Sequence, residues 1–356
     1  MAVIENKVFK LLPICHDRCC SNLIKALIVL LLIYPVHEYY YFQLEFTNWD
    51  LLLFSGIATF ILGLHLARGM PVRFRECITR LENRQVFEFG NMSLEDLFEE
   101  INKKGDFWAR IIGLIAALGI ALAFIDVFLK DYYWPRIFLG IAEAFGAYIA
   151  GNYLGRMASY GQLGGMLKSY DITIKVDPSH IDGVGGLKPV GDFYFYQAMV
   201  VAIPAIYLGV WWFLFPLWPR DYSYWEESYL GLMAIAFSIE ILAFLLPLWS
   251  FHVIMLEKKY DWQCKADDIC NEISELQNAL DTNVTEDEKK NKLAQIEEKT
   301  QRYWAIENMV TWPADIRTRH RFRFNNILLL IPLVGDIVKR HVELSKLVDL
   351  MRKLSG

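Results

Sequence analysis

The chain is poor in charged residues and lacks the motifs that mark the common enzyme classes. Of its 356 residues only 22% are charged, whereas 54% are hydrophobic, a balance too apolar for an ordinary soluble domain. It contains no H-E-x-x-H, no P-loop and no serine, histidine and aspartate set at a recognisable spacing. We therefore predict no catalytic residue, no cofactor and no enzymatic activity.

Cysteine is scarce as well, with six in the chain. All six fall in segments that we place in the cytosol, so we expect free thiols rather than a disulfide framework. Four potential metal ligands lie close together, namely Cys15, His16, Cys19 and Cys20. No second ligand pair follows at a matching spacing, so we predict no metal site. A cleavable signal is not expected, because the segment before the first apolar run is polar and basic.

What the chain has in abundance is long apolar runs. A helix needs about 20 apolar residues to cross a hydrocarbon core about 30 Å thick. Six segments meet this requirement, and they cover residues 23–42, 49–67, 107–128, 133–154, 194–217 and 228–255. Tyrosine and tryptophan gather at their ends, as they do at membrane–water interfaces. Very short loops join the spans in pairs, so we predict an all-α membrane protein with six transmembrane helices in three hairpins over residues 23–255.

Lysine and arginine indicate which side of the membrane each loop faces. The N-terminal residues 1–22 and the longer loops 68–106 and 155–193 are rich in both, whereas the short loops offer only three basic residues. Basic loops stay in the cytoplasm. We therefore predict a multi-pass protein whose N- and C-termini are both cytoplasmic.

The first long loop contains two predicted helices. In residues 72–84, four arginines are interleaved with apolar residues, which fits a helix lying against anionic headgroups or one that extends the second span. Ser93 to Asp96 has the composition of a capped helix start, and we expect Gly105 to end that helix.

A cytoplasmic antiparallel helical hairpin is predicted over residues 256–312. Apolar residues recur at heptad spacing from Trp262 to Leu280, as in a coiled coil, and Thr285 with Glu288 forms a capping box that opens the second helix. A turn of a few residues favours two arms that pack on each other. The same pattern also permits pairing between copies in an oligomer.

The C-terminal residues 313–356 are basic and amphipathic, and we expect helices close to the membrane. Residues 327–338 are apolar but too short to span. They either dock on the membrane or re-enter it, or they form the buried core of a cytoplasmic domain. The sequence leaves these alternatives open.

Two carboxylates lie near the middle of predicted spans, Glu143 in the fourth and Glu240 in the sixth. An ionised carboxylate is costly at that depth, so such groups face protein or water and often mark an ion pathway. A run of small residues around Glu143 permits close helix packing, and its members are Gly140, Ala144, Ala147, Gly151 and Gly155. In a symmetric oligomer this run could place a ring of carboxylates around a pore axis. The alternative is that each glutamate is a hydrogen-bonded packing residue.

A glycine-rich loop precedes the fifth span and contains His180, Asp182, Gly185 and Gly186. Glycine permits positive φ and close backbone approach, while the histidine and the aspartate supply polar groups. We favour a tightly folded elbow that braces the fifth span, with a ligand site as the alternative.

Four arginines alternate along the C-terminal segment, at Arg317, Arg319, Arg321 and Arg323. Such a cluster beside an apolar segment most often contacts anionic lipid headgroups. The alternative is a soluble polyanion such as a nucleic acid.

Two short motifs carry a resemblance to known proteins. They read His180-x-Asp182-x-x-Gly185-Gly186-Leu187 and Trp312-Pro313-x-Asp315-Ile316-Arg317-Thr318. Together they resemble paired signatures in a group of bacterial multi-pass membrane proteins. The overall layout also resembles the membrane subunit of Hailong-type anti-phage defence systems, an effector that forms ion pores. That resemblance implies an oligomeric pore in the bacterial inner membrane, held closed by a cytoplasmic ligand such as a nucleic-acid oligomer, with the basic C-terminal cluster as the contact.

The predicted function is therefore an ion-channel effector of homo-oligomeric build, gated from the cytoplasm and active in antiviral defence. Its expected partners are membrane lipids, further copies of the chain, and a cytoplasmic gating ligand or partner protein. The first alternative is a secondary transporter, although the prolines of the spans show no symmetric repeat. The second is a membrane-bound enzyme that uses His180 and Asp182, two residues that do not by themselves make an active site.

Overall fold

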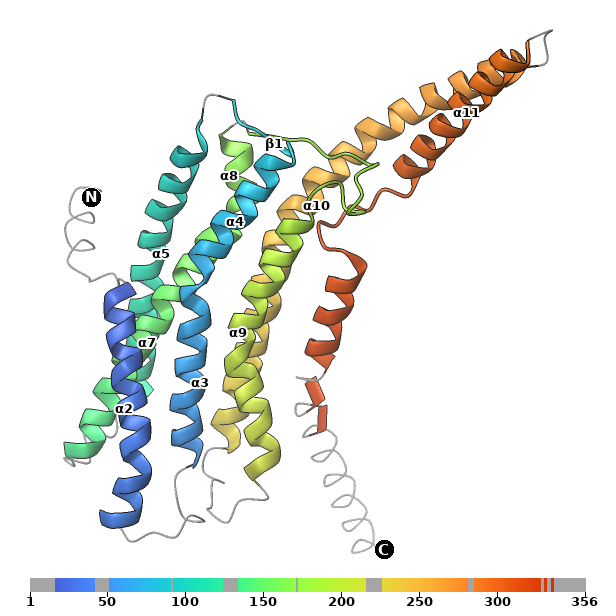
Figure 1. Cartoon of the computed structure of the whole chain (residues 1–356). Coiled ribbons are helices and arrows are strands. Elements are labelled where there is room, and N and C mark those ends of the chain that lie inside the picture. Colours follow the sequence, from blue (N-terminus) through green and yellow to red (C-terminus); the bar gives the residue numbers. More distant parts are fainter. Residues whose placement is uncertain are drawn as a thin grey trace, which may run out of the picture.

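The computed structural model describes residues 17–41, 51–90, 92–123, 134–170, 172–215, 226–280, 285–327, 330–331 and 334–335. These residues are almost entirely helical (Figure 1), so the expected all-α class is confirmed. A small departure is an antiparallel pair of two-residue strands, β1 (Phe87–Glu88) and β2 (Thr173–Ile174), which joins the two long loops.

The helices divide into a bundle and a protruding arm (Figure 1). Their bounds are α2 (Asp17–Tyr41), α3 (Leu51–Arg68), α4 (Met70–Asn83), α5 (Leu94–Ala123), α7 (Trp134–Gly161), α8 (Leu163–Ser169), α9 (Lys188–Leu214), α10 (Glu226–Asn278) and α11 (Glu286–Glu307). A further helical stretch covers residues 316–327. The first part of α10 belongs to the bundle, and its distal part forms the arm with α11.

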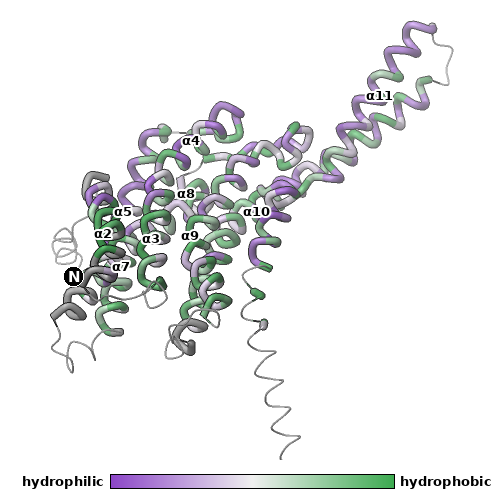
Figure 2. Tube along the Cα trace, turned by 60° about the horizontal axis from the view of Figure 1, so that its bottom comes forward, coloured by the Kyte–Doolittle hydropathy of each residue, from purple (hydrophilic) through white to green (hydrophobic). Residues whose placement is uncertain are grey.

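The surface of the bundle is apolar where that of a soluble protein would be polar. Ile115 and Leu122 of α5 are both 63% exposed, and Ile141 of α7 is 56% exposed. Figure 2 shows the contrast between the hydrophobic bundle helices and the largely hydrophilic arm. This distribution fits a bundle whose outer face meets lipid.

Four helical stretches among the described residues are long and apolar enough to cross a membrane. They are Leu51–Asn83, Leu94–Leu122, Lys188–Leu214 and Gly231–Asn278. The chain is therefore a helical membrane protein. Helices α2 and α7 lie at the two remaining predicted spans and pack in the same bundle (Figure 1).

The buried core lies at the end of the bundle from which the arm departs. Helix α4 follows α3 after the single turn residue Gly69, and its Phe74, Ile78 and Leu81 are buried. The ring of Phe74 stacks on Tyr160 of α7 at a centroid distance of 4.5 Å. The structure therefore agrees with the second interpretation of residues 72–84, a helix that extends α3. The apolar face of this helix packs against other parts of the protein.

Helix α5 begins as predicted but does not end as predicted. Its first turn is capped by Ser93, whose Oγ accepts a hydrogen bond from the backbone N–H of Asp96 at 3.2 Å. The helix then continues to Ala123 through Gly105, so the prediction of a helix end at this glycine is wrong. A Cβ at Gly105 would lie 3.0 Å from Ser159 Oγ of α7. This glycine therefore permits close helix packing, which no local pattern distinguishes from a helix stop.

The arm is an antiparallel pair of helices in one chain. Helix α10 continues from the bundle into the arm without a break, and α11 returns along it. The capping box of Thr285 and Glu288 at the start of α11 is confirmed. Glu272 of α10 forms an ion pair with Lys299 of α11, and Ala266 of the heptad pattern is buried. The heptad pattern is thus used within the chain.

Residues beyond the arm return to the bundle. Residues 316–327 form a helix beside α9 and α10 (Figure 1). In the apolar segment that follows, Ile327, Ile331 and Val334 are 60%, 48% and 53% exposed. The described part of residues 327–338 is thus not buried by the rest of the described chain. The predicted N-terminal segment up to residue 16, which contains Cys15 and His16, lies outside the described residues.

Candidate functional site at the start of helix α9

The glycine-rich loop before α9 is organised around one carboxylate. Asp182 accepts hydrogen bonds from the backbone N–H groups of Val184 and Gly186, both at 3.0 Å, and from that of Lys188 at 3.3 Å. Val184 and Gly186 donate to Oδ1, and Lys188 donates to Oδ2, which also accepts a hydrogen bond from Arg84 Nη1 at 2.8 Å and so ties the loop to the end of α4. The Nδ1 of His180 lies 2.9 Å from Asp182 Oδ1. The polar groups of the loop therefore bind one another.

Three glycines of this loop, Gly183, Gly185 and Gly186, have a positive φ, and the last two also lack space for a Cβ. Gly185 and Gly186 have φ values of +66° and +90°, which other residues rarely adopt. A Cβ at Gly185 would also lie 2.2 Å from Val176 Cγ1. This geometry favours a rigid elbow that sets the direction of α9 over a ligand site.

Hydrogen bonding outweighs burial in setting the acidity of Asp182. Burial of the carboxyl raises its pKa, but the backbone hydrogen bonds from Gly186, Val184 and Lys188 together lower the pKa below its ordinary value. The loop therefore holds an ionised carboxylate at neutral pH.

The tryptophan–proline motif docks on the first turns of α9 and on α10. The ring of Trp312 stacks on His252 of α10 at a centroid distance of 4.5 Å. The carbonyl of Pro313 approaches Gly191 so closely that a Cβ there would lie 2.4 Å from it. The two motifs of the sequence, which lie far apart along the chain, thus meet at the start of α9.

Asp315 fastens this contact. Its Oδ1 accepts a hydrogen bond from the backbone N–H of Thr318 at 2.7 Å, which caps the helix of residues 316–327. Its Oδ2 forms an ion pair with Lys188 Nζ in the first turn of α9. Burial raises the pKa of this carboxyl, but the hydrogen bonds from Lys188 and Thr318 outweigh that effect and lower the pKa to about 2.

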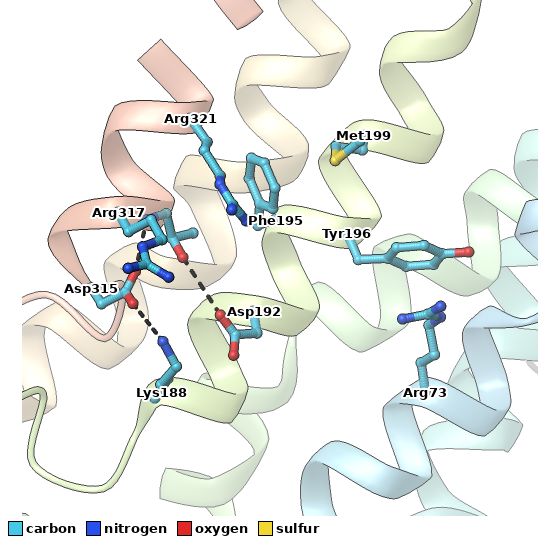
Figure 3. A pocket seen from close by; sticks show the side chains of 10 residues that line it. Arg73, Lys188, Asp192, Phe195, Tyr196, Met199, Asp315, Arg317 and Arg321 are labelled. Carbon is cyan, nitrogen blue, oxygen red and sulfur yellow. Dashed lines mark hydrogen bonds and ion pairs between the residues drawn. The ribbon is translucent and has the colours of Figure 1, made fainter. Parts of the chain in front are cut away.

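A cavity of about 400 Å³ opens beside this ion pair, between α4, α9 and the helix of residues 316–327 (Figure 3). Its lining residues are Arg73, Lys188, Asp192, Phe195, Tyr196, Met199, Asp315, Arg317, Thr318 and Arg321. Four of them are cationic and two are carboxylates, so the lining carries a net positive charge. The guanidinium of Arg73 lies over the ring of Tyr196, 3.9 Å from its centroid.

The structure divides the predicted arginine cluster. Arg317 and Arg321 line the cavity from adjacent turns of one helix face (Figure 3). Arg319 is half-buried and its Nε has no hydrogen-bond partner among the described residues, whereas Arg323 is exposed and does not line the cavity. Alternation in sequence distributes side chains around a helix, so the four arginines do not act as one patch.

The two membrane carboxylates differ in their surroundings. Glu240 is only 2% exposed, and its Oε2 is buried without a hydrogen-bond partner among the described residues. Glu143 of α7 is half-buried. Of the small residues near it, Gly140 is buried, and Ala144 and Ala147 are half-buried.

Two of the glycines of α7 allow this helix to pack closely against α5 of the same chain. A Cβ at Gly151 would lie 2.7 Å from the Gly113 Cα of α5, and one at Gly155 would lie 2.4 Å from the Trp108 carbonyl oxygen. This face of α7 is therefore covered by α5. At Gly151 and Gly155 it is therefore not free to meet another subunit.

Other polar side chains are buried near Glu240. Phe244, one turn along α10, stacks on Phe322 at a centroid distance of 4.0 Å. On α9, Gln197 is 2% exposed and donates from Nε2 to the Ala243 carbonyl at 3.5 Å. Gln197 Oε1 and the Oδ1 of Asn326, one turn beyond Phe322, are both buried without a hydrogen-bond partner in the described part of the chain. Buried polar atoms of this kind call for a partner such as water or an ion.

The structure describes the side chains of three of the six cysteines. Cys77 is buried and Cys264 and Cys270 are exposed, all as free thiols. Within the described ranges no three residues of the metal-ligating types lie together. Comparisons of the chain with protein-family models, curated proteins and solved structures give no match.

Three residues that line the cavity are not among the predicted site residues, namely Arg73, Lys188 and Asp192. The sequence could have indicated the last two, because residues four apart at the start of a helix lie on one face and these two carry opposite charges. No such spacing links Arg73 to them. It reaches the cavity only because α4 packs beside α9.

Proposed function

We propose that the chain is the subunit of an oligomeric ion-conducting pore, opened and closed by its cytoplasmic helices. In this proposal α2, α3, α5, α7, α9 and the first part of α10 form six spans, arranged as three hairpins, and both chain ends are cytoplasmic. The described lengths are sufficient, because the 25 residues of α2 and the 28 of α7 measure about 37 and 42 Å as helices. The positive loops, the exposed elbow and the arm then share one side.

The observation that carries the proposal is the burial of Glu240. It lies 14 residues from the start of α10, about 21 Å along the helix and so within a hydrocarbon core about 30 Å thick. A carboxylate at that depth is expensive unless protein, water or a cation solvates it. Its Oε2 has no protein partner among the described residues, and Gln197 Oε1 and Asn326 Oδ1 are likewise buried without a hydrogen-bond partner there. This is the chemistry of a cation pathway.

Helix α10 links that pathway mechanically to the arm. The same helix holds Glu240 and extends to Asn278 at the arm's tip. At the arm's base, Lys259 Nζ donates to the carbonyl oxygens of Glu307 at 3.3 Å and Met309 at 3.1 Å. Trp262 Nε1 donates to the Val176 carbonyl at 2.9 Å, which joins the arm to the elbow before α9.

Ligand control follows from this connection. A ligand that binds the arm with different affinity in the closed and open states would shift α10 and thereby the pathway. The resemblance to pore-forming defence effectors supplies the biological setting of the proposal, the bacterial inner membrane during phage infection.

Ion flux into liposomes tests the proposal. We expect purified protein to conduct a monovalent cation and Glu240→Gln to reduce the initial rate strongly. The matched control is Ser238→Ala, because this exposed side chain bonds only to Ala234 of its own helix. Flux that is absent under all ligand conditions, or that is unchanged in Glu240→Gln, would contradict the pore.

A secondary transporter is the second candidate, because a lone buried carboxylate also serves proton coupling. Uptake that saturates with one substrate, needs a proton gradient and disappears in Glu240→Gln would favour it. A pore conducts without such saturation or coupling.

The orientation has a separate test. Ile181 at the tip of the elbow is fully exposed, so Ile181→Cys in a cysteine-free background should be accessible. We expect an impermeant maleimide to label it in inside-out vesicles and not in intact cells. Labelling from outside would invert the proposed topology.

A further inference from the structure

We infer that the cavity beside the Lys188–Asp315 ion pair binds the phosphate of an anionic membrane lipid. The inference rests on the membrane placement of α9 and α10 and not on ion conduction, so it survives a protein that does not conduct. It concerns the cavity lined by α4, α9 and the helix of residues 316–327 (Figure 3).

Three cations of the cavity are available for an anion. Lys188 is paired with Asp315, and Asp192 accepts a hydrogen bond from Thr318 Oγ1 at 3.5 Å. Arg73, Arg317 and Arg321 form no ion pair with any carboxylate of the described residues. Arginine is the residue best suited to phosphate, because its planar guanidinium donates two parallel hydrogen bonds.

These arginines line the cavity from two elements. Arg73 comes from α4, and Arg317 and Arg321 come from the opposite wall (Figure 3). The cavity of about 400 Å³ is within the usual range for small-ligand sites, about 300 to 1,000 Å³. It suits a lipid headgroup and is too small to enclose a nucleic-acid oligomer.

The depth of the cavity matches the headgroup layer. The ring centroids of Phe195 and Phe244 lie 6.4 Å apart, and the ring of Phe244 stacks on that of Phe322. These three residues therefore lie at the same height along the bundle axis. That level is 19 residues from the end of α9 and 18 from the start of α10, about 27 to 28 Å along either helix. A hydrocarbon core is about 30 Å thick. The cavity extends along α9 from Lys188 to Met199, one turn beyond this level, and therefore lies at the cytoplasmic edge of the hydrocarbon core.

The outer stripe of α9 changes from polar to apolar across that level. Asp192 is exposed and begins the stripe, Phe195 and Tyr196 continue it, and Met199 is 45% exposed below them. Farther along, the stripe is exposed and wholly apolar, at Ile206, Val210 and Phe213. Aromatic residues at such a transition mark the interface.

The helix of residues 316–327, which forms the other wall of the cavity, shows the same change from polar to apolar residues. Arg317 and Arg321 are followed on the same helix face by Phe324, which is 63% exposed. A lipid with its phosphate between the arginines would thus lay its acyl chains along Met199 and Phe324. A free phosphate or a polynucleotide uses only the charged part of this surface.

Native mass spectrometry of the delipidated full chain, titrated with phosphatidylglycerol or phosphatidylcholine, tests the inference. We expect a preference for phosphatidylglycerol, and Arg317→Gln with Arg321→Gln should weaken its binding about tenfold or more through lost charged hydrogen bonds. Arg323→Gln is the matched control, because it removes an exposed arginine of the same helix outside the cavity. It should bind like the wild type.

Two competition experiments distinguish a lipid phosphate from other sources of phosphate. Inorganic phosphate at low millimolar concentration should not displace the lipid, and neither should a short RNA. Displacement by either, or equal weakening in Arg323→Gln, would overturn the lipid assignment. If the double variant does not fold, Arg73→Gln probes the same cavity from α4, and unchanged lipid binding there would overturn it as well.

Discussion

At the scale of the residue, Asp315 determines how the chain returns to the bundle. One oxygen caps the helix of residues 316–327 and the other pairs with Lys188 at the start of α9. A single carboxylate thus sets where that helix starts and which face it turns to α9.

Removing this side chain should loosen that helix. An aspartate N-cap contributes about 1 kcal/mol, so Asp315→Ala should speed amide hydrogen exchange in residues 316–327 about fivefold. Asp267→Ala, at an exposed position of α10, should leave exchange there unchanged. Equal protection in the two variants would show that Asp315 does not hold the helix.

Acid should have the same effect as the substitution. The pKa of Asp315 is lowered from 3.8 to about 2, so its stabilising contribution is complete above about pH 4 and is lost as the pH falls toward 2. Exchange of residues 316–327, corrected for the intrinsic rate, should accelerate in that window. Asp315→Asn should be less protected at pH 6 and show little change between pH 4 and 2. An unchanged pH response in this variant would assign the transition to another group.

At the scale of the element, the contact between α5 and α7 organises half of the bundle. Gly113 meets Gly151, and the backbone of Trp108 meets Gly155, so the two helices touch through their main chains. Such contacts are typical of membrane helices, which associate by packing and not by excluding water. A side chain at either glycine of α7 has no space.

Substitution of one glycine tests this contact. Gly155→Ala would place a Cβ 2.4 Å from the Trp108 carbonyl oxygen, and overpacking of this kind costs about 1 to 3 kcal/mol. We expect a lower midpoint of thermal unfolding in detergent. Gly119→Ala is the control, because a Cβ at this position of α5 would have nothing within 4 Å, and the change should be neutral or slightly stabilising. Similar midpoints would mean that the helices can separate.

At the scale of the whole molecule, the arm and the bundle form one connected body. The arm's base is bonded to the elbow through Trp262 and to the returning chain through Lys259. The returning chain is in turn fastened to α9 through Asp315. A change at the arm therefore reaches α9 by a second route besides α10.

The closure of the arm on itself can be tested by cross-linking. Glu272 and Lys299 face each other across α10 and α11, so Glu272→Cys with Lys299→Cys, in a chain with Cys264 and Cys270 replaced by serine, should form a disulfide within one chain. Glu272→Cys with Glu298→Cys is the control, because Glu298 is the exposed neighbour of Lys299. A disulfide-linked dimer in the first variant would indicate arms that pair between copies.

Local patterns of the sequence were enough to predict the helical membrane class, the capped starts of α5 and α11, and the antiparallel arm. Each depends on residues within a few turns of one another, through the length of an apolar run, a capping side chain or a heptad repeat. The same local reasoning placed a helix end at Gly105, because a glycine that permits close helix packing has the same immediate neighbours as one that ends a helix.

Only the tertiary structure decided what the long-range contacts are. It brings Lys188 to Asp315, it places Arg73 and Arg317 in the lining of one cavity, it divides the arginine cluster between two helix faces, and it covers the glycines of α7 with α5. It also leaves Glu240 buried with an unpartnered oxygen in the described part of the bundle. These outcomes depend on which helix surfaces pack together, and that choice is made by shape and charge across segments that the linear pattern does not connect.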